Sequence, residues 1–259
     1  MICKICGQES RAVFRAKVLG RHDVQYFHCP SCRFLQTAEP YWLEQAYSNV
    51  INAQDTGLLA RNSDLSRRVA VILYFLFDRK SFFVDYAGGY GVFTRLMRDI
   101  GFNFYWNDPL CPNLFAKGFE WDPVTGRPVE AVTCLEAFEH FVQPREDLAK
   151  VLTVSRTVIF STQLLPHEIP EPADWWYYGL NHGQHISFYS LQTLAHLAAQ
   201  NNLRLYSNRR NLHLMTEKKL SPSKFRLLLK GTNRGLFRFI SKRMSSRTFD
   251  DMTRLDCAP

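Results

Sequence analysis

The sequence predicts an α/β protein with a mainly parallel sheet that ends in an antiparallel hairpin, preceded by a small cysteine-bearing module. From Ser81 onward, short apolar segments alternate with amphipathic helical ones, a pattern typical of βαβ units. Two Cys-x-x-Cys pairs stand near the N-terminus. With 259 residues, 46% of them hydrophobic, the chain is long enough for one sizeable core and one appended module.

The composition excludes several other classes of protein. A chain with 20 Phe and 11 Tyr is not disordered, collagen-like or a coiled coil. Its longest apolar run, Val69 to Phe77, is about half of the ~20 residues that a membrane-spanning helix needs. The N-terminal residues Met1 to Lys4 lack the apolar stretch of a secretory signal, so we expect a cytoplasmic protein without a transmembrane segment.

Four of the seven cysteines predict a metal site. They form two Cys-x-x-Cys turns separated by 22 residues, namely Cys3, Cys6, Cys29 and Cys32. Both thiolates of such a turn face one point, and two turns complete the tetrahedral sulfur site that zinc prefers. Because four thiolates leave no position for water, we predict a structural zinc in a small ribbon over residues 1–38. The other three cysteines, Cys257 among them, lack this spacing and are interpreted as incidental.

A helical linker is predicted over residues 39–80. Trp42, Ala46, Tyr47 and Ile51 recur there at helical spacing. A turn-forming stretch then breaks the pattern before a second, strongly apolar helix. This linker separates the cysteine module from the region in which strands and helices alternate.

The alternating region, residues 81–217, is expected to hold the sheet. Strands are predicted at 81–86, 102–106, 131–135 and 157–161, with a terminal hairpin at 203–207 and 212–215. Helices are predicted at 93–100, around 146–151 and at 191–200. The stretch from Pro166 to Gly183, rich in Pro, Trp and Tyr, is interpreted as a long ordered loop. Residues 218–259 follow as a basic C-terminal segment.

The first predicted strand of this region runs into a glycine-rich turn that opens a helix, Gly88-Gly89-Tyr90-Gly91. Glycines there let a ligand approach the backbone closely. Asp85 directly precedes the turn, which is unfavourable for a pyrophosphate and suits a cationic ligand. Asp108 ends the next strand, where a carboxylate can accept both hydroxyls of a ribose. A nucleoside joined to an amino acid through a sulfonium satisfies both demands; a Rossmann-like domain for another nucleotide is the alternative.

These residues resemble the first motif of the class I S-adenosylmethionine-dependent methyltransferases, an apolar strand, an acidic residue and Gly-x-Gly-x-Gly, with Ala87 at the first glycine. The stretch from Cys134 to Pro144 resembles a second motif, Leu-Glu-x-x-Glu-His-x-x-x-Pro, of the ubiquinone-biosynthesis-like branch. The resemblance covers residues 81–217 and implies a Rossmann-like methyltransferase sheet. The cofactor residues that it implies are Asp85, Tyr86, Ala87, Gly88, Gly89, Gly91, Asp108 and Glu136.

The N-terminal cysteine pairs carry a further resemblance. They are similar to the zinc-binding domain that precedes the methyltransferase domain in bacterial sugar C-methyltransferases and related natural-product and polysaccharide-cluster enzymes. This resemblance implies a small-molecule acceptor, namely a sugar, a nucleotide-sugar or a glycan-related molecule.

Three residues are candidates for proton transfer. His140 lies beside Glu139, and a histidine with a neighbouring carboxylate suits a general base near neutral pH. In the resembling sugar enzymes this Glu-His pair lies at the substrate. The alternative is that the pair caps its loop and keeps the cofactor pocket closed. His185 is the next candidate for the base.

A run of aromatic residues suggests the acceptor pocket. Four aromatic residues in a row, beginning at Trp175, are hard to bury in one direction, so some are expected to line a cavity or a surface. The predicted substrate-binding residues are Trp176, Tyr177, Tyr178 and Gln184. The alternative is a packed lid that makes no direct contact with the substrate.

The positive charge is confined to the C-terminal part of the chain. Residues 204–259 hold 14 Lys and Arg against 4 Asp and Glu, whereas residues 1–203 hold 18 against 20. Such a segment suits an anionic partner, with a solvated basic tail as the alternative. Two other functions therefore stay open. One is an RNA methyltransferase that grips phosphates with the ribbon and this segment, and the other is a non-catalytic module that binds S-adenosylmethionine.

Overall fold

The computed structural model describes residues 1–48 and 55–256. The predicted helical position Ile51 and the incidental Cys257 lie outside the described residues. The chain divides into two compact units. Unit 1 comprises residues 1–52, 135–153 and 160–219, and unit 2 comprises residues 53–134, 154–159 and 220–259.

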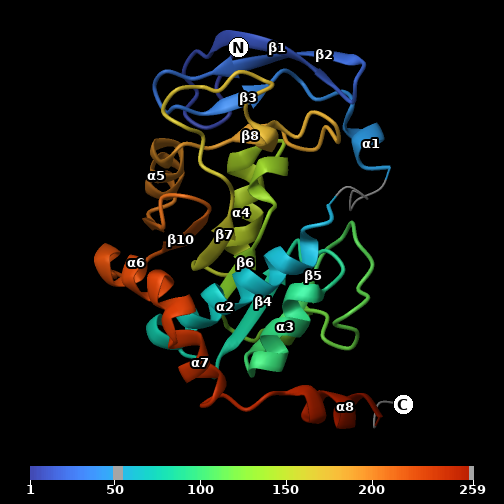
Figure 1. Ribbon diagram of the computed structural model, residues 1–259, viewed down its shortest axis with the longest axis vertical. Helices are drawn as coiled ribbons and strands as arrows, with labels where there is room; N and C mark the ends of the chain where they lie inside the picture. Colours follow the sequence, from blue (N-terminus) through green and yellow to red (C-terminus); the bar gives the residue numbers. More distant parts are fainter. Residues whose placement is uncertain (49–54, 257–259) are drawn as a thin grey trace. The chain divides into compact units, whose positions relative to one another are not determined.

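A four-stranded sheet belongs to unit 1 (Figure 1). Its hydrogen-bonded order is β1 (Arg11–Val18), β2 (His22–His28), β3 (Leu35–Thr37) and β8 (Ser187–Phe188). All three pairings are antiparallel. Buried aromatic side chains, Tyr26, Trp42, Tyr178 and Phe188 among them, pack in one core cluster of this unit. The late segment β8 therefore completes a sheet that the N-terminal residues begin.

The second sheet has six strands in the order β5-β4-β6-β7-β10-β9. Their bounds are β4 (Phe82–Tyr86), β5 (Asn103–Asn107), β6 (Val129–Cys134), β7 (Val158–Ser161), β9 (Arg204–Ser207) and β10 (Leu212–Thr216). Strand β4 is parallel to both β5 and β6, and β10 is antiparallel to β9. The predicted α/β fold, with parallel strands and an antiparallel terminal hairpin in one mixed sheet, is confirmed.

The helices of the alternating region also lie near their predicted positions. They are α3 (Val92–Ile100), α4 (Pro144–Val154) and α5 (Leu191–Gln200). Ser190 is the N-cap of α5, and its hydroxyl accepts from the Thr193 N–H in a capping box. The linker contains the short α1 (Leu43–Ala46) and the long α2 (Leu58–Leu76). Short 3₁₀ turns are η1 (Pro123–Thr125), η2 (Phe138–His140), η3 (Trp176–Tyr178) and η4 (Thr232–Arg234).

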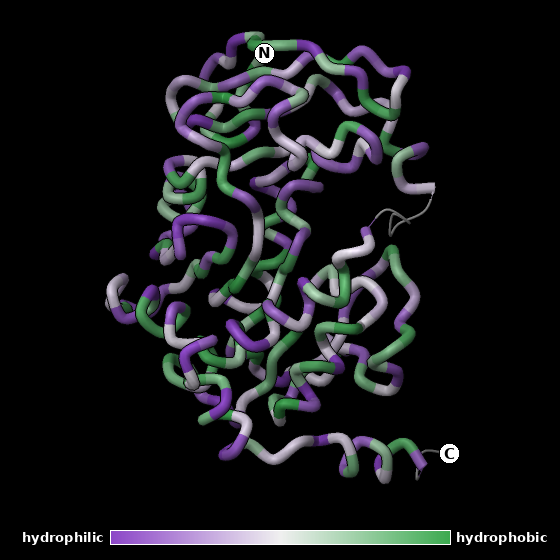
Figure 2. The backbone as a smooth tube through the Cα atoms, in the orientation of Figure 1, coloured by the Kyte–Doolittle hydropathy of each residue, from purple (hydrophilic) through white to green (hydrophobic). Residues whose placement is uncertain are grey.

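The basic C-terminal segment contains three helices of unit 2. They are α6 (Pro222–Gly231), α7 (Leu236–Ser241) and α8 (Thr248–Asp256). Hydrophobic and hydrophilic residues are interspersed along α8 (Figure 2). Asp251 of α8 forms a two-pronged ion pair with Arg98 of α3, with nitrogen–oxygen distances of 2.5 and 2.8 Å. Both side chains are buried, so the end of this segment is docked on α3.

Among the described residues, no helix is both long enough and apolar enough to cross a bilayer.

Candidate functional site

The glycine-rich turn after β4 has a backbone that fits close approach by a ligand. Gly89 and Gly91 adopt left-handed φ angles of +54° and +85°, which glycine reaches without steric cost. A Cβ at Gly88 would come within 2.8 Å of both the Asp85 carboxylate and the Trp106 ring. The Trp106 indole N–H also donates to the Gly89 carbonyl at 2.8 Å. A side chain at position 88 is therefore excluded by Asp85 and Trp106. Without side chains at its glycines, the turn exposes backbone atoms that a ligand can contact.

Asp108, which follows β5, forms a hydrogen bond with this turn. Its Oδ2 accepts from the Gly89 N–H at 2.9 Å, and its Oδ1 accepts from the N–H groups of Leu110 and Cys111 at 2.8 and 3.1 Å. A carboxylate oxygen accepts two hydrogen bonds, so Oδ2 keeps one position for a ligand hydroxyl. These contacts leave Asp108 one acceptor position instead of the two that were predicted for a ribose, so its role toward a ribose stays a prediction; the sequence alone did not indicate the bond to the turn.

Asp85 lies beneath the turn, 2% exposed. Its two oxygens accept from the hydroxyls of Thr133 and Thr94 at 2.8 and 3.1 Å. Burial raises the pKa of Asp85 to about 7, although both hydroxyl bonds lower it. The carboxyl thus shapes the turn from inside unit 2, while its neighbour Tyr86 is half-buried. A role of Asp85 toward a cationic ligand stays a prediction.

Glu136 belongs to unit 1 and has a left-handed backbone, with φ of +51°. Its N–H donates to the Ser161 hydroxyl at 2.7 Å, and that hydroxyl donates to the Glu136 carboxylate at 2.6 Å. A non-glycine residue in this conformation is uncommon and often occurs at functional sites. The serine therefore holds both the backbone and the side chain of this predicted cofactor residue.

The three predicted catalytic residues come together in unit 1. One ring nitrogen each of His140 and His185 and one carboxylate oxygen of Glu139 lie within 4.8 Å of one another. The two imidazole rings are perpendicular, with centroids 5.0 Å apart. His185 Nδ1 donates to the Tyr177 carbonyl at 2.6 Å. The loop after β6 and the segment before β8 thus build one cluster, a proximity that the sequence motifs did not predict; the catalytic roles of its members stay a prediction.

Burial changes the ionisation of this cluster. It lowers the pKa of His140 to about 4, with a further contribution from the charge of His182. It raises the pKa of Glu139 to about 8, and the charge of Glu136 raises it further. The imidazole of His140 is therefore neutral at pH 7. A neutral imidazole has one nitrogen lone pair that can accept a proton.

The predicted substrate-binding residues differ in exposure, although the rings of Trp176 and Tyr177 are in contact, with centroids 5.4 Å apart. Trp176 is 78% exposed, whereas Tyr177, Tyr178 and Gln184 are buried. The Tyr178 hydroxyl donates to the Pro170 carbonyl, and the Gln184 side chain donates to the backbone of α1. Of the three aromatic side chains in this set, the structure thus presents Trp176 to solvent and uses Tyr177 and Tyr178 in the core of unit 1.

The four cysteines of the two pairs form one cluster. The sulfur atoms of Cys3 and Cys32 are 3.5 Å apart, and those of Cys6 and Cys29 are 3.4 Å apart. All four Sγ atoms lie within 4.8 Å of one another. A tetrahedral zinc with Zn–S bonds of about 2.3 Å requires sulfur separations near ~3.8 Å. The arrangement fits that ion and does not fit disulfides, whose sulfurs are about 2.05 Å apart.

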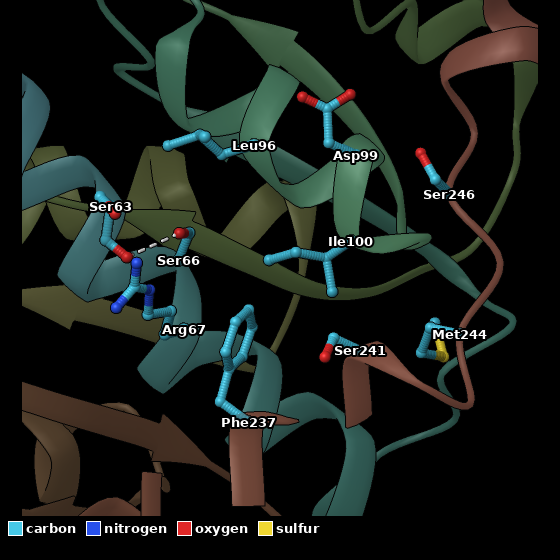
Figure 3. Close-up of a pocket in the computed structure, with 10 residues that line it drawn as sticks. All are labelled: Ser63, Ser66, Arg67, Leu96, Asp99, Ile100, Phe237, Ser241, Met244 and Ser246. Atoms are coloured by element: carbon cyan, nitrogen blue, oxygen red, sulfur yellow. Dashed lines mark hydrogen bonds between the residues drawn. The ribbon is translucent and has the colours of Figure 1, made fainter. Parts of the chain in front are cut away.

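A separate cavity of about 370 Å³ lies in unit 2 (Figure 3). Ser63 and Arg67 of α2, Asp99 of α3 and Phe237 of α7 are among the residues that line it. None of its lining residues belongs to the predicted cofactor, substrate, catalytic or metal sets. It is therefore a distinct feature of the helical side of this unit.

A family model described as a methyltransferase domain matches residues 60–208, more than half of the chain. The chain belongs to this methyltransferase family. The prediction of a methyltransferase is thereby confirmed. Curated proteins include no significant match to the sequence of this methyltransferase.

Solved structures similar to this methyltransferase include TnmH, at 15% identity and a TM-score of 0.49, with 69% of this chain and 62% of the other covered. An O-methyltransferase family 2 protein from Planctomyces limnophilus, in complex with apigenin, is 15% identical with a TM-score of 0.43, covering 66% and 63%. Magnesium protoporphyrin IX methyltransferase from Synechocystis is 16% identical with a TM-score of 0.45, covering 67% and 92%. The chain thus spans less than two thirds of the length of the first two.

Ala87 departs from the glycine pattern of this methyltransferase motif, and its backbone adopts a sterically unfavourable conformation. Its φ is +56°, a conformation that costs an L-residue roughly 1–2 kcal/mol. We expect Ala87→Gly to raise the free energy of unfolding by about 1 kcal/mol, as measured by urea denaturation. The control is Ala149→Gly on the exposed surface of α4, where the same change lowers stability by about 0.5–1 kcal/mol. A loss of stability in both variants would contradict the strain argument.

The cysteine cluster of this methyltransferase is expected to hold one zinc per chain. Elemental analysis of protein purified without added metal should find close to one equivalent. Cys29→Ser should release the ion and loosen the four-stranded sheet, because metal binding supplies folding energy to so small a unit. Cys111→Ser is the control, since Cys111 lies outside the cluster and its substitution should leave the zinc content unchanged. Protein without metal would refute the assignment.

Tyr47 is a member of the catalytic cluster that the sequence did not indicate. Its hydroxyl lies 2.8 Å from His140 Nδ1, although the two residues are 93 positions apart. Burial raises the pKa of Tyr47 above its ordinary value, so the phenol stays protonated. No local pattern signals a contact between the helical linker and the loop after β6. The helical spacing predicted that Tyr47 belongs to the linker, but the partner of its hydroxyl is determined by the tertiary fold.

Proposed function

We propose that this methyltransferase transfers the methyl group of S-adenosylmethionine to a small molecule, namely a sugar, a nucleotide-sugar or a glycan-related acceptor. The observation that carries the proposal is the bond from the Gly89 N–H to Asp108, in a chain of the methyltransferase family. It fixes the glycine turn against a carboxylate that keeps one acceptor position for a ribose hydroxyl. The sugar acceptor is supported by the N-terminal resemblance and by the solvent-exposed indole of Trp176.

When bound, S-adenosylmethionine supplies a methyl group on a positively charged sulfur. The residues of the chain then have two tasks, to hold the reactants in line and to remove the proton of the acceptor. Asp108 and the backbone of the glycine turn serve the first task. Glu136, held by Ser161, is assigned to the cofactor as well.

His140 is assigned to the second task. The Tyr47 hydroxyl can accept from Nδ1–H of His140 across their 2.8 Å contact, which leaves the lone pair on Nε2. The lowered pKa keeps this imidazole neutral, so the lone pair is available throughout the neutral range. Glu139 and His185 complete the cluster around it. In this assignment, Nε2 takes the proton of the acceptor hydroxyl or carbon as the methyl group is transferred.

The proposal is tested by following release of S-adenosylhomocysteine from the purified chain with a panel of nucleotide-sugars. Release that depends on one sugar-linked acceptor supports the proposal. Release with structured RNA and with none of the sugars would refute the acceptor class. Tight binding of S-adenosylmethionine without release in either panel would instead point to the non-catalytic module.

Binding of the cofactor provides a separate prediction. We expect Asp108→Ala to weaken S-adenosylmethionine binding by about 1.5–3 kcal/mol, the range for hydrogen bonds to a charged group, as measured by calorimetry. Asp122→Ala is the matched control, because Asp122 also accepts a backbone N–H in an exposed turn of unit 2. Its affinity should equal that of the parent protein. Unchanged affinity in the Asp108 variant would mean that the ribose is held elsewhere.

A further inference from the structure

The side chain of Glu139 is in an unusual state. It is 1% exposed, and neither carboxylate oxygen has a partner at full hydrogen-bond geometry, although the hydroxyls of Tyr177 and Thr162 lie near enough to lower its pKa. A buried carboxyl without good hydrogen-bond partners loses its hydration without full compensation, and this favours a ligand that binds its oxygens. One ring nitrogen each of His140 and His185 lies within 4.8 Å of a Glu139 oxygen. We propose that Glu139, His140 and His185 bind a divalent transition-metal cation, separate from the zinc predicted at the four cysteines.

The hydrogen bonds of the two histidines suit metal ligation. A ligating histidine commonly donates its other ring N–H to a carbonyl or a similar oxygen, which orients the ring. His185 Nδ1 faces the Tyr177 carbonyl at 2.6 Å, and because a carbonyl only accepts, the lone pair of the neutral ring lies on Nε2. His140 Nδ1 faces the Tyr47 hydroxyl at 2.8 Å, which can accept in the same way. In the tautomer with the proton of each ring on Nδ1, both Nε2 atoms are the ligands, and the hydrogen bond between His140 and the Gln184 backbone gives way to the ion if it is made by Nε2.

The donor set selects the class of ion. Two imidazole nitrogens and one carboxylate favour Zn²⁺, Co²⁺ or Ni²⁺ over Mg²⁺ and Ca²⁺, which prefer sites made wholly of oxygen. Zinc ligand distances are about 2.0–2.2 Å, so a small inward movement of the three side chains brings their donor atoms to one ion. Three protein ligands leave a further position for water or another small ligand.

Occupation of this site has a consequence that rests on the proposed function. The ion and the acceptor's proton compete for the same Nε2 lone pair of His140. A bound cation therefore prevents His140 from acting as a base, so methyl transfer falls as the site fills and recovers when a chelator removes the ion. The cluster would then make turnover sensitive to the supply of transition metal.

The test is calorimetric and spectroscopic titration of the zinc-containing full chain with Co²⁺. Cobalt at the cysteine cluster produces a thiolate charge-transfer band, whereas cobalt bound by nitrogen and oxygen does not. We expect one further equivalent without that band. Glu139→Gln, which preserves the size of the side chain, and His185→Ala should each weaken this binding at least tenfold. Tyr47→Phe should weaken it about tenfold, as for other partners of ligating histidines.

Matched controls come from an exposed neighbouring pair in unit 1. Glu168→Gln and His167→Ala make the same chemical changes at exposed positions and should leave the further equivalent intact. Circular dichroism checks that every variant is folded. Absence of a further equivalent in the parent chain, or its retention in folded Glu139→Gln and His185→Ala, would overturn the metal site. A filled site with unchanged turnover would overturn the assignment of His140 as base while leaving the metal site standing.

Discussion

His140→Ala is expected to lower turnover by roughly 100- to 10,000-fold while S-adenosylmethionine affinity stays close to that of the parent protein. General-base catalysis contributes a factor of this size. The imidazole is neutral because burial lowers its pKa to about 4, and its Nδ1 is oriented by Tyr47 at 2.8 Å. Alanine removes the proton acceptor and leaves the glycine turn of unit 2 unchanged. Steady-state kinetics and calorimetry measure the two quantities separately, on samples that keep zinc at the cysteines and carry no ion at the histidine cluster.

The same variant distinguishes the base from a structural cap. If Glu139 and His140 only close their loop, the substitution should weaken cofactor binding and stability together, with a modest loss of turnover. His167→Ala, at an exposed position of the same unit, is the control and should retain the parent rate. Activity above about a tenth of the parent rate would exclude His140 as an essential base, and His185 would then be the next residue to replace. Tyr47→Phe should reduce turnover less than His140→Ala, because it removes the orienting hydroxyl only.

Asp251→Ala should destabilise the protein by about 3–5 kcal/mol, the range for breaking a buried ion pair by removing one partner. The guanidinium of Arg98 is 1% exposed and stacks over the Phe119 ring at 3.6 Å. It also donates to the Phe104 carbonyl at 2.8 Å. Without Asp251 its charge would stay buried and unpaired in unit 2. Guanidinium chloride denaturation measures the change.

Two comparisons sharpen this prediction. Asp250→Ala removes the exposed neighbouring carboxylate of α8 and should change stability by less than about 0.5 kcal/mol. Burial alone would raise the pKa of Asp251, but the hydrogen bonds and charge of Arg98 lower it overall. The carboxylate therefore stabilises the fold above the ordinary carboxyl pKa, and this contribution disappears as the pH falls through the lowered value. The difference between parent and Asp251→Ala should shrink over that acid range, and a constant difference would contradict the ion-pair explanation.

Short sequence patterns predicted the helices, strands and motifs that depend on neighbouring residues of the chain. The period of apolar residues located β4, α3, β6 and α5 within a few residues, because burial of one face repeats along the element. The double Cys-x-x-Cys spacing predicted the four sulfurs that the structure brings together. The Glu-His pair was placed correctly in the loop after β6. In each case the residues that carry the signal belong to one segment of the chain, the longest being the segment that holds both cysteine pairs.

Contacts between distant residues were not predicted. Tyr47 contacts His140, Asp251 forms an ion pair with Arg98, and β8 pairs with β3. The periodicity of the sequence does not indicate any of these partners. The aromatic residues that begin at Trp175 are a second case, because the sequence does not indicate which of their rings are exposed. Its composition indicated that some rings must face outward, but only the packing of unit 1 decides that Trp176 is exposed while Tyr177 and Tyr178 are buried. Side-chain direction in a loop depends on its surroundings, which single-sequence patterns do not contain.

The four-stranded sheet also has a consequence for how the chain matures. Strands β1 to β3 leave the ribosome before β8, which completes their sheet in the register Leu35 with Phe188 and Gln36 with Ser187. Strands β4 to β7 are all synthesised in between. The open edge of β3 therefore stays unpaired during most of translation, and unpaired edges attract other chains. Early capture of a metal ion by the cysteines would steady this nascent sheet and limit misassembly until its last strand arrives.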